Sequence, residues 1–279
     1  MLRMIPTALA ILAFVAFGTS AIAETAVERG RYLATSIMAC GNCHTPRGPD
    51  NSPLAGMELA GGYRIDAPVF VAYAQNITQD AETGIGKWTD AQIVAAMREG
   101  RRPDGSIIGA PMSIGMYRGL SDNDVNALVA YLRTVKPVRN IAPKSEYKMP
   151  LPKTYGPPLG RIADVARDDK VAYGRYLAGP AGHCIECHSP RGPKGPDIEN
   201  NLGAGGALFL NQAGPSVSTN ITPTGLAKYS DAEIRQIITT GVRPDGSRLK
   251  LPMAIPYYAK IAPADLDALV AYLRSLPPK

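Results

Sequence analysis

The sequence contains the run Cys40-Gly41-Asn42-Cys43-His44, and a second run of the same pattern, Cys184-Ile185-Glu186-Cys187-His188, follows 144 residues later. The pattern C-x-x-C-H is typical of a covalent attachment site for a c-type haem. Its two thiols can form thioethers with one haem, and the adjacent histidine then lies under the iron as proximal ligand. Because the chain has four Cys and three His, two haems would use every cysteine and leave only His183 without a proximal role.

Two other uses of the cysteines have to be weighed against haem attachment. An exported protein can carry two disulfides, and C-x-x-C is half of a zinc site. The histidine after each pair disfavours disulfides, and structural zinc requires its ligands in one cluster, whereas these pairs stand 144 residues apart in matching contexts. We therefore expect two covalently bound haem c groups, with His44 and His188 as iron ligands.

The two motifs belong to a tandem repeat that covers most of the chain. Residues 30–34, Gly-Arg-Tyr-Leu-Ala, recur at 174–178, an offset of 144 residues. From Thr83 onward the offset is 141, because the first copy holds three extra residues. We expect a first repeat over residues 24–136, a linker over 137–165 and a second repeat over 166–279.

Each repeat shows the pattern helix, loop, helix, loop, helix, with few strand signals and long loops rich in Gly and Pro. Capping boxes and apolar residues at helical spacing mark the helix starts. The expected helices are residues 26–38, one from Thr89 and one from Ser121 in the first repeat, and residues 171–178, one from Ser230 and one from Pro263 in the second. The predicted fold class is all-α.

The linker between the repeats is dense in proline, with six prolines between Lys136 and Gly160. Proline at this density prevents helix and favours an extended chain. Apolar residues of the linker, among them Tyr147, Leu151 and Tyr155, would be exposed if it stood free. We expect it to cross the surface and pack on one or both repeats.

The ligand opposite the proximal histidine decides between electron transfer and substrate chemistry. The first repeat offers Met112 and Met116 in the loop before its last helix. Met112 matches Met253 in the second repeat, whereas Met116 matches Tyr257. A methionine that recurs at one place in both repeats indicates a ligand rather than a side chain that fills a gap in the core. We predict the ligand pairs His44/Met112 and His188/Met253.

The first residues indicate an export signal. Arg3 precedes an apolar run over residues 5–17, and Ala21-Ile22-Ala23 is a suitable cleavage site before Glu24. We expect a signal peptide over residues 1–23 that is removed in the periplasm; the alternative is an uncleaved signal that anchors the protein. No later segment of the sequence is long and apolar enough to span a bilayer.

The charge of the chain argues against a nucleic-acid partner and does not distinguish among protein partners. The chain carries 30 Lys and Arg against 24 Asp and Glu, a net charge of +6. No basic run is dense enough to indicate nucleic-acid binding. The excess of positive charge lies mainly in the second half, where it would either steer docking to an acidic redox partner or form an ordinary solvated surface.

Each repeat resembles a class I cytochrome c domain: an N-terminal helix, C-x-x-C-H, a methionine loop and a C-terminal helix containing Leu-Val-Ala-Tyr-Leu-Arg. More narrowly, the repeats are similar to the haem domains of cytochrome subunits of bacterial alcohol and gluconate dehydrogenases. Those domains carry motifs that stand here as Asn76-Ile77-Thr78, residues 83–88, Met112 and Tyr131-Leu132. Such subunits typically have three haem domains, whereas this chain shows two.

The resemblance implies two tandem class I cytochrome c domains and close helix crossings at Gly30 with Tyr131 and at Gly174 with Tyr272. Arg47 and Arg191 would either pair with a haem propionate or lie in a solvated loop. As a function the resemblance implies electron transfer rather than catalysis, between a dehydrogenase and a respiratory acceptor. The expected partners are periplasmic or membrane redox proteins, with peripheral membrane association through such a partner.

The rival interpretation is a dihaem enzyme, such as a peroxidase or a small-molecule oxidase, with one substrate-accessible haem. Such an enzyme needs an open iron face and usually a spare histidine near it. The only candidate, His183, precedes Cys184 directly and is expected on the proximal side, as a solvent-facing or capping residue. The acidic pairs Asp122/Asp124 and Asp168/Asp169 stand at helix starts, where we interpret them as caps.

Overall fold

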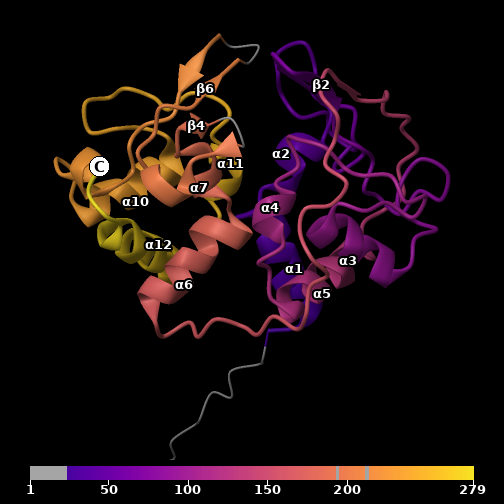
Figure 1. The fold of residues 1–279 in the computed structure, drawn as a ribbon, viewed down its shortest axis with the longest axis horizontal. Coiled ribbons are helices and arrows are strands. Elements are labelled where there is room, and N and C mark those ends of the chain that lie inside the picture. Colours follow the sequence, from indigo (N-terminus) through magenta and orange to yellow (C-terminus); the bar gives the residue numbers. More distant parts are fainter. Residues whose placement is uncertain (1–23, 193–194, 211–213) are drawn as a thin grey trace, which may run out of the picture.

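The structure is a computed structural model that describes residues 24–192, 195–210 and 214–279. Two helical units lie side by side, the first repeat in indigo to magenta and the second in orange to yellow (Figure 1). The prediction of two mainly helical repeats is confirmed. The predicted signal peptide, residues 1–23, lies outside the described residues.

The elements of the first repeat and the linker follow the expected order, with short strands added. They are α1 Ala26–Thr35, α2 Cys40–His44, β1 Arg64–Ala67, β2 Phe70–Tyr73, α3 Asp90–Glu99, α4 Ile114–Tyr117, α5 Asp122–Leu132 and, in the linker, β3 Glu146–Tyr147. The three strands form one antiparallel sheet in the order β1-β2-β3.

The second repeat has the same plan. Its elements are α6 Lys170–Tyr176, the π-helical turn η1 Leu177–Ala181, α7 Cys184–Cys187, β4 Arg191–Gly192, β5 Gly195–Pro196, α8 Ile198–Asn201, β6 Leu208–Phe209, β7 Ser216–Val217, α9 Pro223–Leu226, α10 Asp231–Thr240, α11 Ile255–Tyr258 and α12 Pro263–Ser275. The helix expected over residues 171–178 ends as the wider turn η1, which contains Pro180. Because proline lacks an N–H and crowds the preceding turn, the α-helical hydrogen bonds cannot continue there.

The first and last helices of each repeat cross at a glycine, as expected. A Cβ atom on Gly30 would overlap the carbonyl oxygen of Ala127 and stand 2.9 Å from Cβ of Tyr131. Gly174 meets the carbonyl of Ala268 in the same way. The absence of a side chain on each glycine allows the two backbones to touch, and this contact places the end of α1 or α6 beside the attachment motif.

The middle helices begin as the sequence predicts. The Thr89 side chain accepts a hydrogen bond from the Gln92 N–H while the Gln92 side chain accepts one from the Thr89 N–H, and Ser230 and Glu233 do the same. Each pair satisfies N–H groups that the first helical turn leaves free. Buried Ile93 and Ile234 then turn the apolar face of each helix inward.

The linker packs on the first repeat along an extended path. Its strand β3 pairs with β2, and the Tyr147 hydroxyl donates a hydrogen bond to the Ala110 carbonyl at 2.8 Å. The Tyr155 hydroxyl donates to the Ile108 carbonyl at 2.7 Å. These contacts lie just before the Met112 loop, so the linker covers one side of the predicted first haem site.

Candidate haem sites

The first attachment motif forms one short helical turn, α2, directly after a residue in the left-handed region. Ala39 has φ 48° and ψ 41°, which turns the chain sharply out of the segment after α1. The helical turn then places Cys40 and Cys43 three positions apart, on one face, with His44 at its end.

The His44 ring is held by a backbone carbonyl. Its Nδ1 lies 2.7 Å from the carbonyl oxygen of Gln75. Because a carbonyl oxygen only accepts hydrogen bonds, Nδ1 must carry the proton, and in the neutral ring Nε2 then has a free lone pair. Burial lowers the pKa of His44, an effect that the bond to Gln75 opposes. A neutral, oriented imidazole with Nε2 available is what a proximal iron ligand requires.

The second motif repeats this geometry at the same offset. His183 has φ 42° and precedes α7, and Nδ1 of His188 lies 2.8 Å from the Thr219 carbonyl oxygen. Burial lowers the pKa of His188 as well. Gln75 and Thr219 are 144 residues apart, so the partner of each histidine is also part of the repeat. Sequence reasoning missed these two carbonyls, because a backbone contact leaves no signature in residue type.

The four cysteines form no disulfide with one another, and their burial disfavours the charged form of the side chain. Burial raises the pKa of Cys40 to about 12, that of Cys184 to about 11 and that of Cys187 to about 12. Within the described residues no group of three or more His, Cys, Asp or Glu is placed to hold a metal ion. The two pairs therefore provide buried neutral thiols for thioether bonds rather than thiolates gathered around zinc.

The two predicted methionines occupy equivalent loops. Met112 follows Pro111 and is partly buried against the core, and Met253 follows Pro252. Met253 lines a cavity of about 290 Å³ together with Arg47 and Tyr257. Met116 is also packed against this core, which contains residues of both repeats, so packing alone does not distinguish it from Met112.

The residue at the repeat position of Met116 faces the other repeat. The Tyr257 hydroxyl lies against Gly41, inside the first attachment motif, where a Cβ atom would clash with it. Burial raises the pKa of Tyr257. Position 257 therefore contacts the neighbouring repeat.

Arg47 lies close to the first motif with part of its guanidinium unused. Its Nη1 donates to the Asn51 carbonyl at 2.8 Å and its Nη2 to Asn42 Oδ1 at 2.9 Å. Its Nε is buried and has no hydrogen-bond partner among the described residues. A buried N–H without a partner is costly, and a propionate of a bound haem is an acceptor of suitable charge. Arg47 and the attachment motif beside it therefore fit the haem group that the C-x-x-C-H pattern implies.

The two motifs face each other across the boundary between the repeats. Burial raises the pKa of Tyr258, and the thiols of Cys184, Cys187 and Cys43 add to this rise. Tyr258 thus lies near cysteines of both repeats. Helices α4 and α11 lie at the same boundary, beside α2 and α7 (Figure 1).

His183 lies in this boundary rather than in solvent. Its ring packs edge-on against Tyr117 of the first repeat, with ring centroids 5.8 Å apart, and its side chain is 25% exposed. It occupies the position before α7 but makes no side-chain capping bond, so the expectation of a solvent-facing or capping residue was wrong. The helix from Ser121 likewise places Asp124 in a buried contact between the repeats, beyond the capping role expected of it.

Comparison with known proteins agrees with the two repeats. The family model described as "Cytochrome c" matches residues 27–136 and again 171–277. The fructose dehydrogenase cytochrome subunit of Gluconobacter japonicus is 36% identical over 91% of this chain and 53% of its own length. The cytochrome c subunit of the quinone alcohol dehydrogenase of Gluconobacter oxydans is 34% identical over 91% of this chain and 55% of its own length.

The chain therefore spans about half the length of these two relatives. A "Diheme cytochrome c-type" protein of Cereibacter sphaeroides is 30% identical over 85% of this chain and 82% of its own length. The matched residues include both attachment motifs and both helix crossings. The chain belongs to the cytochrome c family and carries two haem c groups, one for each C-x-x-C-H motif.

Proposed function

We propose that the chain is a periplasmic dihaem electron carrier that passes electrons from a dehydrogenase to a respiratory acceptor. The observation that carries this proposal is the duplicated site, in which a carbonyl-held histidine is followed by a methionine loop in both repeats. In the relatives, cytochrome subunits belong to alcohol, fructose and gluconate dehydrogenases. The functional units are residues 24–136 and 166–279, joined by the linker 137–165.

In each unit three kinds of side chain hold the haem: the two cysteines of the motif, its histidine and a methionine. The thiols of Cys40 and Cys43, or of Cys184 and Cys187, attach it covalently. The proximal ligand is His44 in the first unit and His188 in the second, each fixed in tautomer and orientation by a backbone carbonyl. When bound, the haem supplies reversible one-electron chemistry, and a thioether ligand raises its reduction potential.

Met112 and Met253 complete the two sites as distal ligands and close them to substrate. This closed arrangement favours a carrier over the rival dihaem enzyme, for which His183 would have to serve a distal face. The packing of His183 against Tyr117 gives no support to that role. A dehydrogenase donor and an oxidase or cytochrome acceptor are the proposed partners.

The ligand assignment predicts different results for two neighbouring methionines. Met112→Ala should remove about half of the near-infrared Met–iron absorption of the oxidised protein, because one of two thioether ligands is lost. Met116→Ala is the matched control and should retain the full band, and Met253→Ala should remove the other half. Loss of the band in Met116→Ala, with Met112→Ala unchanged, would contradict the assignment. Haem stain after denaturing electrophoresis checks that attachment is unaffected.

The partner assignment is tested with membranes from the source organism that lack this chain. Purified oxidised protein is added together with ethanol, gluconate or fructose, and reduction of both haems is followed by absorbance. We expect one of these donors to reduce both haems, since relatives serve dehydrogenases of this kind. Haems that stay oxidised with every donor, in a protein that turns over hydrogen peroxide, would favour the enzyme instead.

As for membrane attachment, the helices of the described part of the chain include none with the length and apolar character needed to cross a bilayer.

A further inference from the structure

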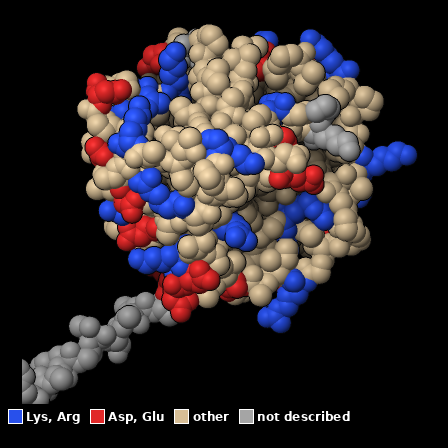
Figure 2. All heavy atoms as spheres, turned by 60° about the vertical axis from the view of Figure 1, so that its left-hand side comes forward, with Lys and Arg blue, Asp and Glu red and all other residues tan. Residues whose placement is uncertain are grey.

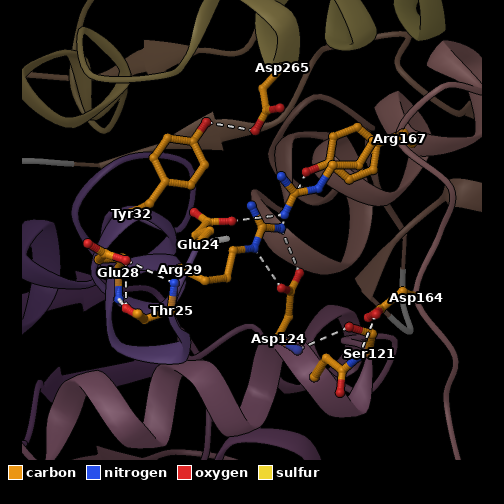
Figure 3. Close-up of polar contacts among 12 residues, drawn as sticks. Glu24, Thr25, Glu28, Arg29, Tyr32, Ser121, Asp124, Asp164, Arg167 and Asp265 are labelled. Atoms are coloured by element: carbon orange, nitrogen blue, oxygen red, sulfur yellow. Dashed lines mark hydrogen bonds and ion pairs between the residues drawn. The ribbon is translucent and has the colours of Figure 1, made fainter. Parts of the chain in front are cut away.

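The boundary between the repeats is built from two equivalent hydrogen-bonded pairs. The Tyr176 hydroxyl donates to Asp124 Oδ2 at 2.6 Å. The Tyr32 hydroxyl donates to Asp265 Oδ2 at 2.7 Å (Figure 3). Tyr32 and Tyr176 occupy the same position of the repeat, and so do Asp124 and Asp265. Each pair joins the first helix of one repeat to the last helix of the other, so the two pairs are related by an approximate two-fold axis.

Each tyrosine hydroxyl also receives a hydrogen bond. The N–H of Ser121 donates to the Tyr176 oxygen at 3.3 Å, and the N–H of Ala262 donates to the Tyr32 oxygen at 3.1 Å. Ser121 and Ala262 are the N-cap residues of α5 and α12. Burial and the neighbouring carboxylate raise the pKa of both tyrosines, so they remain protonated donors at neutral pH.

Arg29 adds an ion pair on one side only. Its Nε and Nη2 donate to the two oxygens of Asp124 at 2.7 and 2.9 Å, and both side chains are 9% exposed. Nη2 also donates to the Tyr173 hydroxyl at 3.3 Å. Figure 3 shows Arg29 reaching from α1 toward Asp124 on α5. A buried network with all members bonded favours one arrangement of its parts, because any other leaves a polar group unpaired.

The helices joined by this network lead directly to the haem motifs. Helix α1 ends at Thr35 and α2 begins at Cys40, while α6 and η1 lead to α7. Between the network and the motifs the repeats are in contact: a Cβ on Gly182 would stand 3.0 Å from Ile37, and one on Gly119 would stand 2.7 Å from Pro180. A small rotation of one repeat about the network would therefore change the separation of the motifs.

We propose that Tyr32, Tyr176, Asp124 and Asp265, with Arg29, are positioning residues that fix the distance between the two haems for electron transfer within the chain. This inference rests on the proposed carrier function. With haem bound, the transfer would move one electron from the reduced site to the oxidised site, with no bond made or broken and no proton moved. Two domains joined by a linker move relative to each other unless their interface prevents it. An apolar core cluster crosses this boundary, and the directional bonds of these pairs fix how the two repeats are oriented across it.

The test removes both hydroxyls and keeps both rings. The double variant Tyr32→Phe/Tyr176→Phe should lose the bisignate circular-dichroism signal that two nearby haems produce in the Soret region, because such coupling weakens steeply with distance and angle. Interhaem electron exchange, followed after flash reduction of one site, should slow. Haem content and the Met–iron band should stay unchanged, since neither tyrosine is placed as a ligand.

Tyr155→Phe is the matched control, because its hydroxyl also donates a hydrogen bond, here to the Ile108 carbonyl, but joins the linker to the first repeat. It should retain the Soret signal. If the double variant folds poorly, each single variant should give a partial loss. An unchanged Soret signal and exchange rate in folded variants overturns the proposal, as does a wild-type protein without the signal. A wild-type protein with the signal that no dehydrogenase reduces would contradict the carrier function but not the positioning role.

Discussion

Gly30→Ala is expected to destabilise the first repeat strongly. Its methyl group would overlap the carbonyl oxygen of Ala127 and press on Cβ of Tyr131, both fixed in α5. Overpacking of a core typically costs about 1–3 kcal/mol and sometimes more. The clash involves backbone on both sides, so we expect the upper end of this range, even though alanine favours helix over glycine by about 1 kcal/mol. Gly174→Ala should act equally on the second repeat.

Denaturant unfolding of the haem-loaded protein measures this effect, with haem absorbance and far-ultraviolet circular dichroism as probes. Gly115→Ala is the control, because Gly115 lies in a helix and a Cβ there would meet no atom within 4 Å. It should be neutral or slightly stabilising. If Gly30→Ala and Gly115→Ala are equally stable, α1 and α5 can move apart with no loss of stability. That result would contradict the close contact of the two helices at Gly30.

Sequence reasoning succeeded where the fold depends on local signals or on the repeat. The capping residues Thr89 and Ser230 start helices because they bond N–H groups three positions away, and such pairs can be read directly. The close contact at Gly30 followed from the resemblance, and the structure confirms it. Assignment of Met112 and Met253 as ligands stays a prediction, since the side chains are placed in equivalent loops without a direct test.

Sequence reasoning failed where the partner of a residue lies in the other repeat. Asp124 stands in the first turn of a helix and looks like a capping residue, yet it accepts a hydrogen bond from the Tyr176 hydroxyl of the second repeat. His183 was misjudged for the same reason, because Tyr117 covers it from the first repeat. The strands were missed because they are two to four residues long, too short for an alternating pattern to stand out.

The ion pair between Arg29 and Asp124 leads to the second large expected effect, which is on the stability of the folded protein. Asp124→Ala should lower the free energy of unfolding by about 3–5 kcal/mol, because it leaves the charge of Arg29 buried without its partner. Burial alone would lower the pKa of Arg29, but the bonds to Asp124 outweigh it and the pKa is raised. Without the carboxylate only the lowering effect of burial remains, but a guanidinium keeps its proton at neutral pH even then. The charge is therefore buried without a partner unless the fold opens to let water reach it.

Asp265→Ala provides the comparison, because it occupies the same position of the second repeat and is equally buried, at 7% exposed against 6%. In the described part of the chain Asp265 bonds Tyr32 but no basic side chain. Its removal should cost only the bond to a charged acceptor, about 1.5–3 kcal/mol. Thermal and denaturant unfolding of both variants measure the difference. Equal losses would show that Arg29 contributes nothing beyond the tyrosine bonds, whereas a larger loss for Asp124→Ala would show that the ion pair within the first repeat adds to the stability that the Tyr176 bond provides.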